Sequence, residues 1–340
     1  MKNWQPPEKL KKITTIDAHT AGEPFRIITS GIDEPPGDTI LEKRKYAVKN
    51  LDYLRKVLMW EPRGHADMYG CIVTKAVTKE ADFGVLFMHN EGFSTMCGHG
   101  IIGIATIAIE TGFIKAESKN QVVKIDTPAG LVTATAHMSK NRVESVSFQN
   151  VPSFALVDNH IDVPSLGRVN YDLGFGGAFY AFVNAADLGL KCSPDFFPEL
   201  VKKGMEIKRA IMEKTKINHP FEDDLSFLYG TIFIEPADKN GIHSKHVCIF
   251  AEGEVDRSPT GTGVSARLAI LHQKGEIIKD QKIMIQSIIK SSFSGKVVLE
   301  TNFGPFKAVI PEVKGSAYIT GRHEFLIDPD DPLKQGFVLR

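Results

Sequence analysis

The chain has 340 residues, of which 42% are hydrophobic and 24% are charged, an ordinary balance for one large or two smaller globular domains. Its 41 basic residues balance its 41 acidic ones, so no net positive field attracts a nucleic acid or an anionic membrane surface. The N-terminal segment has no apolar signal-peptide core, and the longest apolar run is about half as long as a membrane span. We therefore expect a soluble cytoplasmic protein, with neither nucleic acid nor membrane as a partner.

Short strands are predicted in runs rich in Val, Ile, Phe and Thr that are bounded by Gly, Pro, Asn and Asp. In chain order, these runs cover residues 16–31, 70–77, 83–88, 121–127, 130–138 and 143–151. Amphipathic helices are predicted over residues 50–59 and 193–214, the second with Ser193 as N-cap and Pro194 at the first helical position.

The segment after Cys97, GHGIIGIATIAIETG, is apolar on every side and predicts a buried helix that ends near Gly112. Ser94 and Thr95 are candidate caps for its start. A sheet curled around this helix is the simplest way to bury it.

This helix has a counterpart later in the chain, SPTGTGVSARLAILHQKG. When Cys97 is aligned with Thr260, the glycines at both helix starts and both helix ends coincide, and neighbouring strands such as DMYGCIVT and FLYGTIFI repeat in the same order. We therefore predict an α+β protein of two pseudo-symmetric domains, each a curled β-sheet around a central helix. The first covers residues 1–165 and the second 166–314, and a return of strands at about 315–340 to the first domain is left open.

The two helix starts are suited to binding an anion. The first amides of a helix lack intrahelical acceptors, and the helix dipole adds partial positive charge there. Two such starts at one cleft would hold a carboxylate and direct Cys97 and Thr260 at its α-carbon from opposite faces. Because both starts are rich in glycine, we expect a ligand anion to reach the amides of Gly98, His99, Gly100, Gly261, Thr262 and Gly263.

Ionisation of Cys97 needs more than the helix dipole, which contributes about 0.3–1 kcal/mol, less than one pKa unit. His99 and the ammonium of a bound amino acid are the candidate cations. Asp256 is either a turn residue or a partner for that ammonium. An inert, packed thiol is the structural alternative, but an open cap flanked by glycines favours chemistry at Cys97.

Other ligands have less support. The four cysteines, Cys71, Cys97, Cys192 and Cys248, form neither a CxxC pair nor a dense framework, which fits free thiols in a reducing compartment. A metal site on Cys97 and His99 lacks a second Cys/His group at ligand spacing, so we expect no metal. The run PTGTGVSA resembles a phosphate-binding loop, but the nine residues AEGEVDRSP lie between the preceding strand and Thr260, and no lysine follows its glycines.

The motifs MCGHG and DRSPTGTG, with DAHTAGEP and PRGHADMYG, resemble the signatures of the proline racemase family over essentially the whole chain. The resemblance implies a diaminopimelate-epimerase-like fold, chemistry without a cofactor at the α-carbon of proline-like amino acids, and a homodimer.

Family members that racemise or epimerise carry a cysteine at both helix starts, so one thiol removes the α-proton and the other returns a proton on the far face. Here Cys97 occupies the first position and Thr260 the second. Because a threonine hydroxyl does not ionise near neutral pH, two-way proton transfer is not expected. The Cys/Thr combination resembles that of the family's trans-3-hydroxy-L-proline dehydratases, which need only one face.

The resemblance thus implies a hydro-lyase that converts trans-3-hydroxy-L-proline to Δ1-pyrroline-2-carboxylate, with Cys97 as the base. Thr260 either orients the substrate or fills the space of the absent second thiol. A proline or 4-hydroxyproline racemase or epimerase and a non-catalytic amino-acid-binding protein are the alternatives. By matching positions, the amides of Gly98, His99, Gly261 and Thr262 would hold the carboxylate, Asp256 and the His99 side chain the ammonium, and Tyr69 and Phe250 would exclude water.

Overall fold

The computed structural model describes residues 4–237 and 241–339. Its helices are α1 (Ile40–Asn50), α2 (Asp52–Met59), α3 (Gly98–Glu110), α4 (Phe197–Lys214) and α5 (Gly261–Gln273), with short 3-10 helices at Ala185–Leu188, Pro194–Phe196 and Asp223–Leu225. Its strands are β1 (Lys11–Thr20), β2 (Glu23–Ser30), β3 (Tyr69–Thr74), β4 (Phe83–His89), β5 (Asn120–Thr127), β6 (Gly130–Ser139), β7 (Arg142–Gln149), β8 (Ser153–Val163), β9 (Gly167–Phe175), β10 (Phe179–Asn184), β11 (Leu228–Pro236), β12 (Ser244–Phe250), β13 (Glu254–Val255), β14 (Ile283–Gln286), β15 (Ser292–Phe303), β16 (Phe306–Gly315) and β17 (Ala317–Ile327). None of these helices combines the length and the hydropathy needed to cross a membrane.

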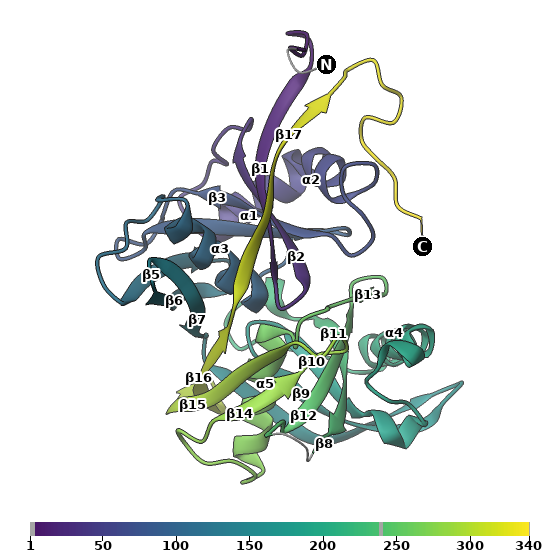
Figure 1. The fold of residues 1–340 in the computed structure, drawn as a ribbon. Helices are drawn as coiled ribbons and strands as arrows, with labels where there is room; N and C mark the ends of the chain where they lie inside the picture. Colours follow the sequence, from purple (N-terminus) through teal and green to yellow (C-terminus); the bar gives the residue numbers. More distant parts are fainter. Residues whose placement is uncertain (1–3, 238–240, 340) are drawn as a thin grey trace.

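Figure 1 shows the elements in two groups, and the upper or first group contains α1–α3, β1–β7 and β17. Strands β1 and β2 form an antiparallel hairpin, β3 runs parallel to β2, and β4 runs antiparallel to β3. After α3, β5 runs parallel to β4 and continues into the antiparallel strands β6 and β7. Strand β17 pairs with β1, so the last strand of the chain lies beside the first.

The lower or second group contains α4, α5 and β8–β16. Strand β10 is antiparallel to β9 and parallel to β11, which is antiparallel to β12. After α5, β14 runs parallel to β12 and continues into the antiparallel strands β15 and β16. Strand β16 also pairs with β7 and β8, which joins both groups into one hydrogen-bonded network.

The boundary expected at residue 165 falls in the turn of a hairpin. Strands β8 and β9 pair antiparallel up to Val163 and Gly167, so the residues on both sides of the expected boundary belong to the second group. Residues 153–163 have alternating buried and exposed positions, and they form a strand that the sequence patterns did not predict.

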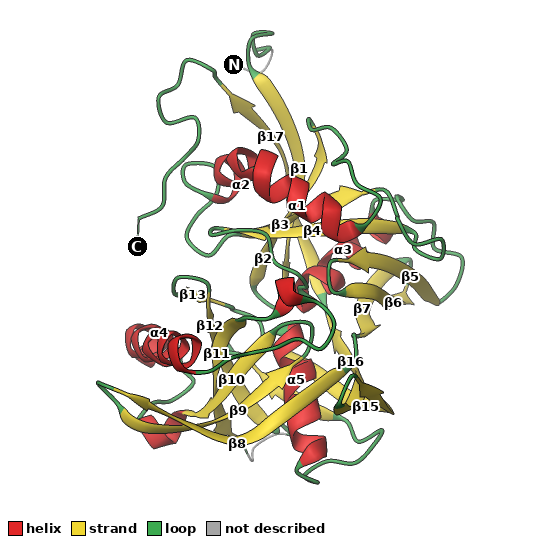
Figure 2. Cartoon of the chain, turned by 180° about the vertical axis from the view of Figure 1, so that it is seen from behind, coloured by secondary structure: helices red, strands yellow, loops and turns green. Residues whose placement is uncertain are grey.

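Helices α3 and α5 occupy the interior of the two groups, with strands around them, as Figure 2 shows. Residues Gly98–Ile109 of α3 and Gly261–Leu271 of α5 are all buried, which confirms the predicted burial of the apolar helix after Cys97. Burial of each large aliphatic or aromatic side chain stabilises the fold by about 1.5–3 kcal/mol.

Strands in both groups are covered on both faces. In β4, Phe87 packs in the core around α3, whereas Leu86 and Met88 pack against the outer helices α1 and α2. In β12, Cys248 faces the inner core and Val247 and Ile249 face α4. Successive side chains of a strand point to opposite faces, so these strands read as continuous apolar runs.

Local details differ from the sequence expectations. Cys97 itself is the N-cap of α3, while Ser94 hydrogen-bonds to Tyr69 and Thr95 to the carbonyl of Gly177. Ser193 precedes Pro194 at the start of a short 3-10 helix, and α4 follows it directly.

Candidate active site

The N-termini of α3 and α5 meet where the two groups of elements join. A Cβ atom on Gly98 would lie 2.5 Å from Cα of Gly261, and one on Gly261 would lie 2.6 Å from Cα of Gly98. Carbon atoms in contact are normally about 3.5–4.0 Å apart, so only glycine lets these two backbones approach so closely. The first amides of both helices therefore point into one small space.

This space is a cavity of about 20 Å³, enough for roughly one water molecule. Nine residues predicted for the site from the sequence line it: Tyr69, Cys97, Gly98, His99, Phe250, Asp256, Thr260, Gly261 and Thr262; Gly100 and Gly263, whose amides were also expected to reach a ligand, do not. Residues that are 163 positions apart, such as Cys97 and Thr260, thus come together at one cavity.

The Cys97 thiol is held between the helix start and an imidazole. Its Sγ accepts a hydrogen bond from the amide of Gly100 at 3.1 Å and lies 3.3 Å from Nδ1 and 3.4 Å from Nε2 of His99. The expectation that the Gly100 amide is open to a ligand anion is wrong, because Sγ occupies it. The amides of Gly98, His99, Gly261 and Thr262 have no acceptor within the described residues.

Burial raises the pKa of Cys97 well above its ordinary value, because a thiolate loses its hydration there. The Gly100 amide acts in the opposite direction, and the Asp256 carboxylate adds to the rise. The side chain is therefore a thiol, not a thiolate, at neutral pH.

His99 does not supply the positive charge that a Cys97 thiolate needs. Burial lowers the pKa of His99, and the Asp256 carboxylate offsets this only in part, so the imidazole is neutral at neutral pH. Asp256 Oδ2 lies 3.9 Å from His99 Nδ1, and Oδ1 accepts the Ser258 amide at 2.7 Å. Among the described residues, no group of three or more His, Cys, Asp or Glu side chains is arranged to hold a metal ion.

Thr260 has an unusual backbone conformation. Its φ of 64° and ψ of 97° are strained for a β-branched residue, at a cost of about 1–3 kcal/mol. Unlike Cys97, it does not cap its helix with its side chain. Its buried Oγ1 lies beside the weakly hydrogen-bonding thiol of Cys248 and has no other hydrogen-bond partner in the described part of the chain. The hydroxyl therefore faces the cavity with most of its hydrogen-bonding capacity unused.

Aromatic rings enclose the cavity. The Tyr69 ring contacts the His99 ring edge to face at 4.7 Å between centroids, and Phe250 stacks on Tyr229 at 5.4 Å. Tyr180 Oη is 2.7 Å from Oγ1 of Thr262, which fixes that side chain beside the start of α5.

Sequence reasoning missed four residues that line the cavity: Met96, Tyr180, Tyr229 and Cys248. Tyr229 had a usable signal, because it precedes Gly230 in FLYG as Tyr69 precedes Gly70 in DMYG. Tyr180 and Cys248 had none, since their strands read only as apolar runs.

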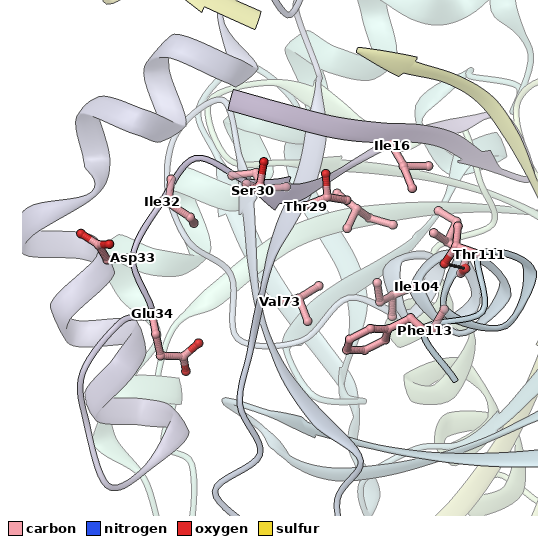
Figure 3. Close-up of a pocket in the computed structure, with 14 residues that line it drawn as sticks. Ile16, Thr29, Ser30, Ile32, Asp33, Glu34, Val73, Ile104, Thr111 and Phe113 are labelled. Atoms are coloured by element: carbon pink, nitrogen blue, oxygen red, sulfur yellow. Dashed lines mark hydrogen bonds between the residues drawn. The ribbon is translucent and has the colours of Figure 1, made fainter. Parts of the chain in front are cut away.

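A larger cavity of about 350 Å³ lies beside the C-terminal half of α3 (Figure 3). Ile104, Thr111 and Phe113 line one side of it, and Asp33 and Glu34 lie at the other. It contains none of the predicted site residues, so chemistry and not volume identifies the cavity at the helix starts as the candidate active site.

The comparisons with known proteins agree with this geometry. The model of the proline racemase family matches residues 15–338. The trans-3-hydroxy-L-proline dehydratase of Colwellia psychrerythraea is 47% identical, over 99% of this chain and 96% of the relative. The proline racemase of Acetoanaerobium sticklandii is 45% identical, over 97% of this chain and 99% of the relative. The crystal structure of a hydroxyproline epimerase from Agrobacterium vitis with bound trans-4-hydroxy-L-proline has a TM-score of 0.91 at 31% identity, over 97% of this chain and 96% of the other.

A head-to-head pair of helix starts with a buried thiol on one side is the central feature of this α+β protein, and the solved epimerase shares its fold. The chain belongs to the proline racemase family.

Proposed function

We propose that this protein is a hydro-lyase that converts trans-3-hydroxy-L-proline to Δ1-pyrroline-2-carboxylate without a cofactor. The observation that carries the proposal is the pairing of one thiol, Cys97, with one non-ionising hydroxyl, Thr260, at the two helix starts. The relative named as a dehydratase supports this reaction, and the relative named as a racemase supports the alternative, racemisation or epimerisation of a proline.

Substrate binding begins with the carboxylate. It accepts hydrogen bonds from the amides of Gly98, His99, Gly261 and Thr262, which also stabilise the negative charge that spreads onto it from the α-carbon. The ring ammonium pairs with Asp256, and the α-hydrogen then faces Cys97.

The substrate ammonium also promotes ionisation of the Cys97 thiol. Burial keeps Cys97 protonated and His99 neutral, so a cation must arrive before the thiolate can form. The substrate itself brings that cation into a site of low dielectric constant, where it favours the thiolate strongly, and the thiol proton leaves to solvent as the substrate binds. A ligand without a charged nitrogen is therefore a poor activator.

The elimination uses one face of the ring. In trans-3-hydroxy-L-proline, the α-hydrogen and the 3-hydroxyl lie on the same face. The Cys97 thiolate removes the α-proton, the electron pair forms the C2–C3 double bond, and the C3–O bond breaks. The departing oxygen takes the proton from the Cys97 thiol and leaves as water, and the enamine then tautomerises to the imine.

We assign Thr260 to substrate orientation. Its strained backbone and its buried, mostly unpartnered hydroxyl suggest a hydrogen bond to the ligand that compensates for both costs. It cannot return a proton to the second face, because its hydroxyl does not ionise near neutral pH.

The cavity of about 20 Å³ is far smaller than a pyrrolidine ring, so the two groups of elements separate to admit the substrate. Tyr69 and Phe250 would then close over it and exclude water.

We further infer that the two groups are pseudo-symmetric domains. The pairing pattern of β1–β5 around α3 repeats in β9–β12 and β14 around α5. Because β8 belongs with β9, we place the boundary near residue 151, earlier than 165, with β17 returning to the first domain. A homodimer and a cytoplasmic location stay proposals from the family resemblance and the composition.

The proposal is tested by supplying the two 3-hydroxy-L-proline diastereomers and following the imine by proton NMR. We expect imine from the trans isomer alone, because in the cis isomer the hydroxyl and the α-hydrogen lie on opposite faces. Absence of imine from the trans isomer, with inversion of proline or 4-hydroxyproline, would identify an epimerase. Tight binding of proline without any reaction would identify a binding protein.

A further inference from the structure

Glu23 is a buried carboxyl that links the two groups of elements. It is the first residue of β2 and has no solvent exposure. Its Oε2 accepts the amide of Arg257 at 2.6 Å, and its Oε1 has no hydrogen-bond partner within the described residues. Because Arg257 directly follows Asp256, Glu23 contacts the segment that presents Asp256 to the cavity.

The charged neighbours of Glu23 are mostly acidic. Asp256 and Asp67 act on it as anions, and Arg257 is the basic neighbour. The guanidinium of Arg257 is shared, because its Nη1 lies 2.9 Å from Oδ2 of Asp67. Other titratable groups near this turn are the thiols of Cys97 and Cys248, which feel the charge of Glu23. His99 lies 3.9 Å from Asp256, and His19 Nδ1 accepts the Gly22 amide.

Charge balance decides the state of this cluster. Glu23, Asp256 and Asp67 share the guanidinium of Arg257, which cannot balance all three charges in a buried cluster, so one carboxyl keeps a proton. Each carboxyl accepts one backbone amide, Asp256 from Ser258 and Glu23 from Arg257, but Glu23 has no solvent exposure and its Oε1 has no partner within the described residues, so the proton belongs on Glu23. Burial, with the Asp256 carboxylate as the second cause, raises the pKa of Glu23 well above its ordinary value.

We propose that Glu23 is a positioning residue that holds this proton in the ligand-free protein and releases it to solvent when a cationic ring nitrogen binds at Asp256. The inference rests on the proposed function, since it takes the ligand to be a secondary ammonium such as a proline. No bond other than the carboxyl O–H changes: Glu23 becomes a carboxylate and one proton enters the solvent.

This arrangement makes the site selective for charged nitrogen. A bound ammonium replaces the lost proton as the positive charge of the cluster, and both carboxylates then attract it. Binding that releases a proton becomes tighter as the pH rises, by about tenfold per pH unit below the pKa of Glu23. A ring with a neutral nitrogen, such as pyrrole-2-carboxylate, gains nothing from the carboxyl pair.

The test is isothermal titration calorimetry in buffers of different ionisation enthalpy, which counts released protons. A Cys97→Ser background removes the thiol as a proton source and stops turnover, and the ligands are L-proline, trans-3-hydroxy-L-proline and pyrrole-2-carboxylate. With the first two ligands, we expect the Cys97→Ser chain to release about one proton per bound molecule. The double variant Cys97→Ser/Glu23→Gln should release none. Pyrrole-2-carboxylate should release none. The exposed Glu91→Gln serves as the matched control and should release as many protons as the parent.

Equal proton release with and without Glu23, or no release from the parent, overturns the inference. If the Glu23→Gln chain does not fold, infrared difference spectra of the Cys97→Ser chain provide the test. Addition of L-proline should remove the carbonyl band of a protonated carboxyl. Persistence of that band would overturn the inference. Imine production by the wild-type chain without Glu23-dependent proton release would leave the proposed function intact and refute the inference alone. Failure of both amino acids to bind, together with no imine from the wild-type chain, would overturn both.

Discussion

The contact between the two helix starts leads to a quantitative prediction for Gly98→Ala. The new Cβ would lie 2.5 Å from Cα of Gly261 and 2.8 Å from its carbonyl carbon, both backbone atoms that no side-chain rotation can move. Ordinary contact distances of about 3.5–4.0 Å require the helix starts to separate by about 1 Å or more. Overpacking of this kind costs about 1–3 kcal/mol of stability. A displacement of about 1 Å between the carboxylate site and Cys97 should lower kcat/KM about 100-fold.

The assay compares imine formation from trans-3-hydroxy-L-proline, and unfolding by urea, in Gly98→Ala, Gly261→Ala and Gly92→Ala. Gly261→Ala makes the reciprocal contact at 2.6 Å and should behave like Gly98→Ala. Gly92→Ala is the control, because a Cβ at that position would have nothing within 4 Å and its φ is not positive. Wild-type turnover by Gly98→Ala would refute the claim that the helix starts must touch for the site to work.

The remaining predictions concern three side chains of the site. Cys97→Ser should lower kcat by about 10²–10⁴-fold while L-proline binding, measured by calorimetry, stays close to wild type; an active serine variant would remove the thiol from the mechanism. Thr260→Cys should introduce inversion at the α-carbon of L-proline, seen by chiral chromatography, and no inversion at all would count against the two-face argument. Thr260→Val removes a buried hydroxyl that has only a weak thiol partner, so stability should hold or rise by about 1 kcal/mol while KM for the substrate increases; a purely space-filling threonine predicts an unchanged KM. The pKa of Glu23 is raised from 4.5 in the folded chain, so the wild type should lose stability relative to Glu23→Gln as the pH rises above about 4.5, by up to about 1.4 kcal/mol per unit until the folded pKa is reached. Urea unfolding across that pH range measures the difference, and a constant difference would show that Glu23 ionises normally.

The site could be predicted from the sequence because the chain contains an internal repeat. Aligning Cys97 with Thr260 is enough to identify both helix starts, and these two residues line one cavity together with Gly98, His99, Gly261 and Thr262. The same repeat pairs Tyr69 with Tyr229, so that residue was within reach as well.

Other features depend on packing across the fold, which local patterns do not contain. The contact between Gly98 and Gly261 joins residues far apart in the chain, and only the folded backbone shows how close it is. The motif containing Glu23 gives no sign that this carboxyl has no solvent exposure.

Two features have local signals that the sequence interpretation did not use. Helix α1 begins with a capping box, in which Thr39 accepts the Glu42 amide and the Glu42 carboxylate accepts the Thr39 amide. The turn of the β8–β9 hairpin lies where the domain boundary was expected, and the Pro, Ser and Gly residues near it mark hairpin turns as readily as linkers.

The most direct test of the account is to incubate the protein with trans-3-hydroxy-L-proline, L-proline and trans-4-hydroxy-L-proline in deuterium oxide, in parallel, and to follow each by proton NMR. One thiol on one face predicts Δ1-pyrroline-2-carboxylate from the 3-hydroxy substrate alone and no inverted product from the other two. Inverted, α-deuterated proline or 4-hydroxyproline without the imine would contradict the account and show that the protein epimerises despite Thr260.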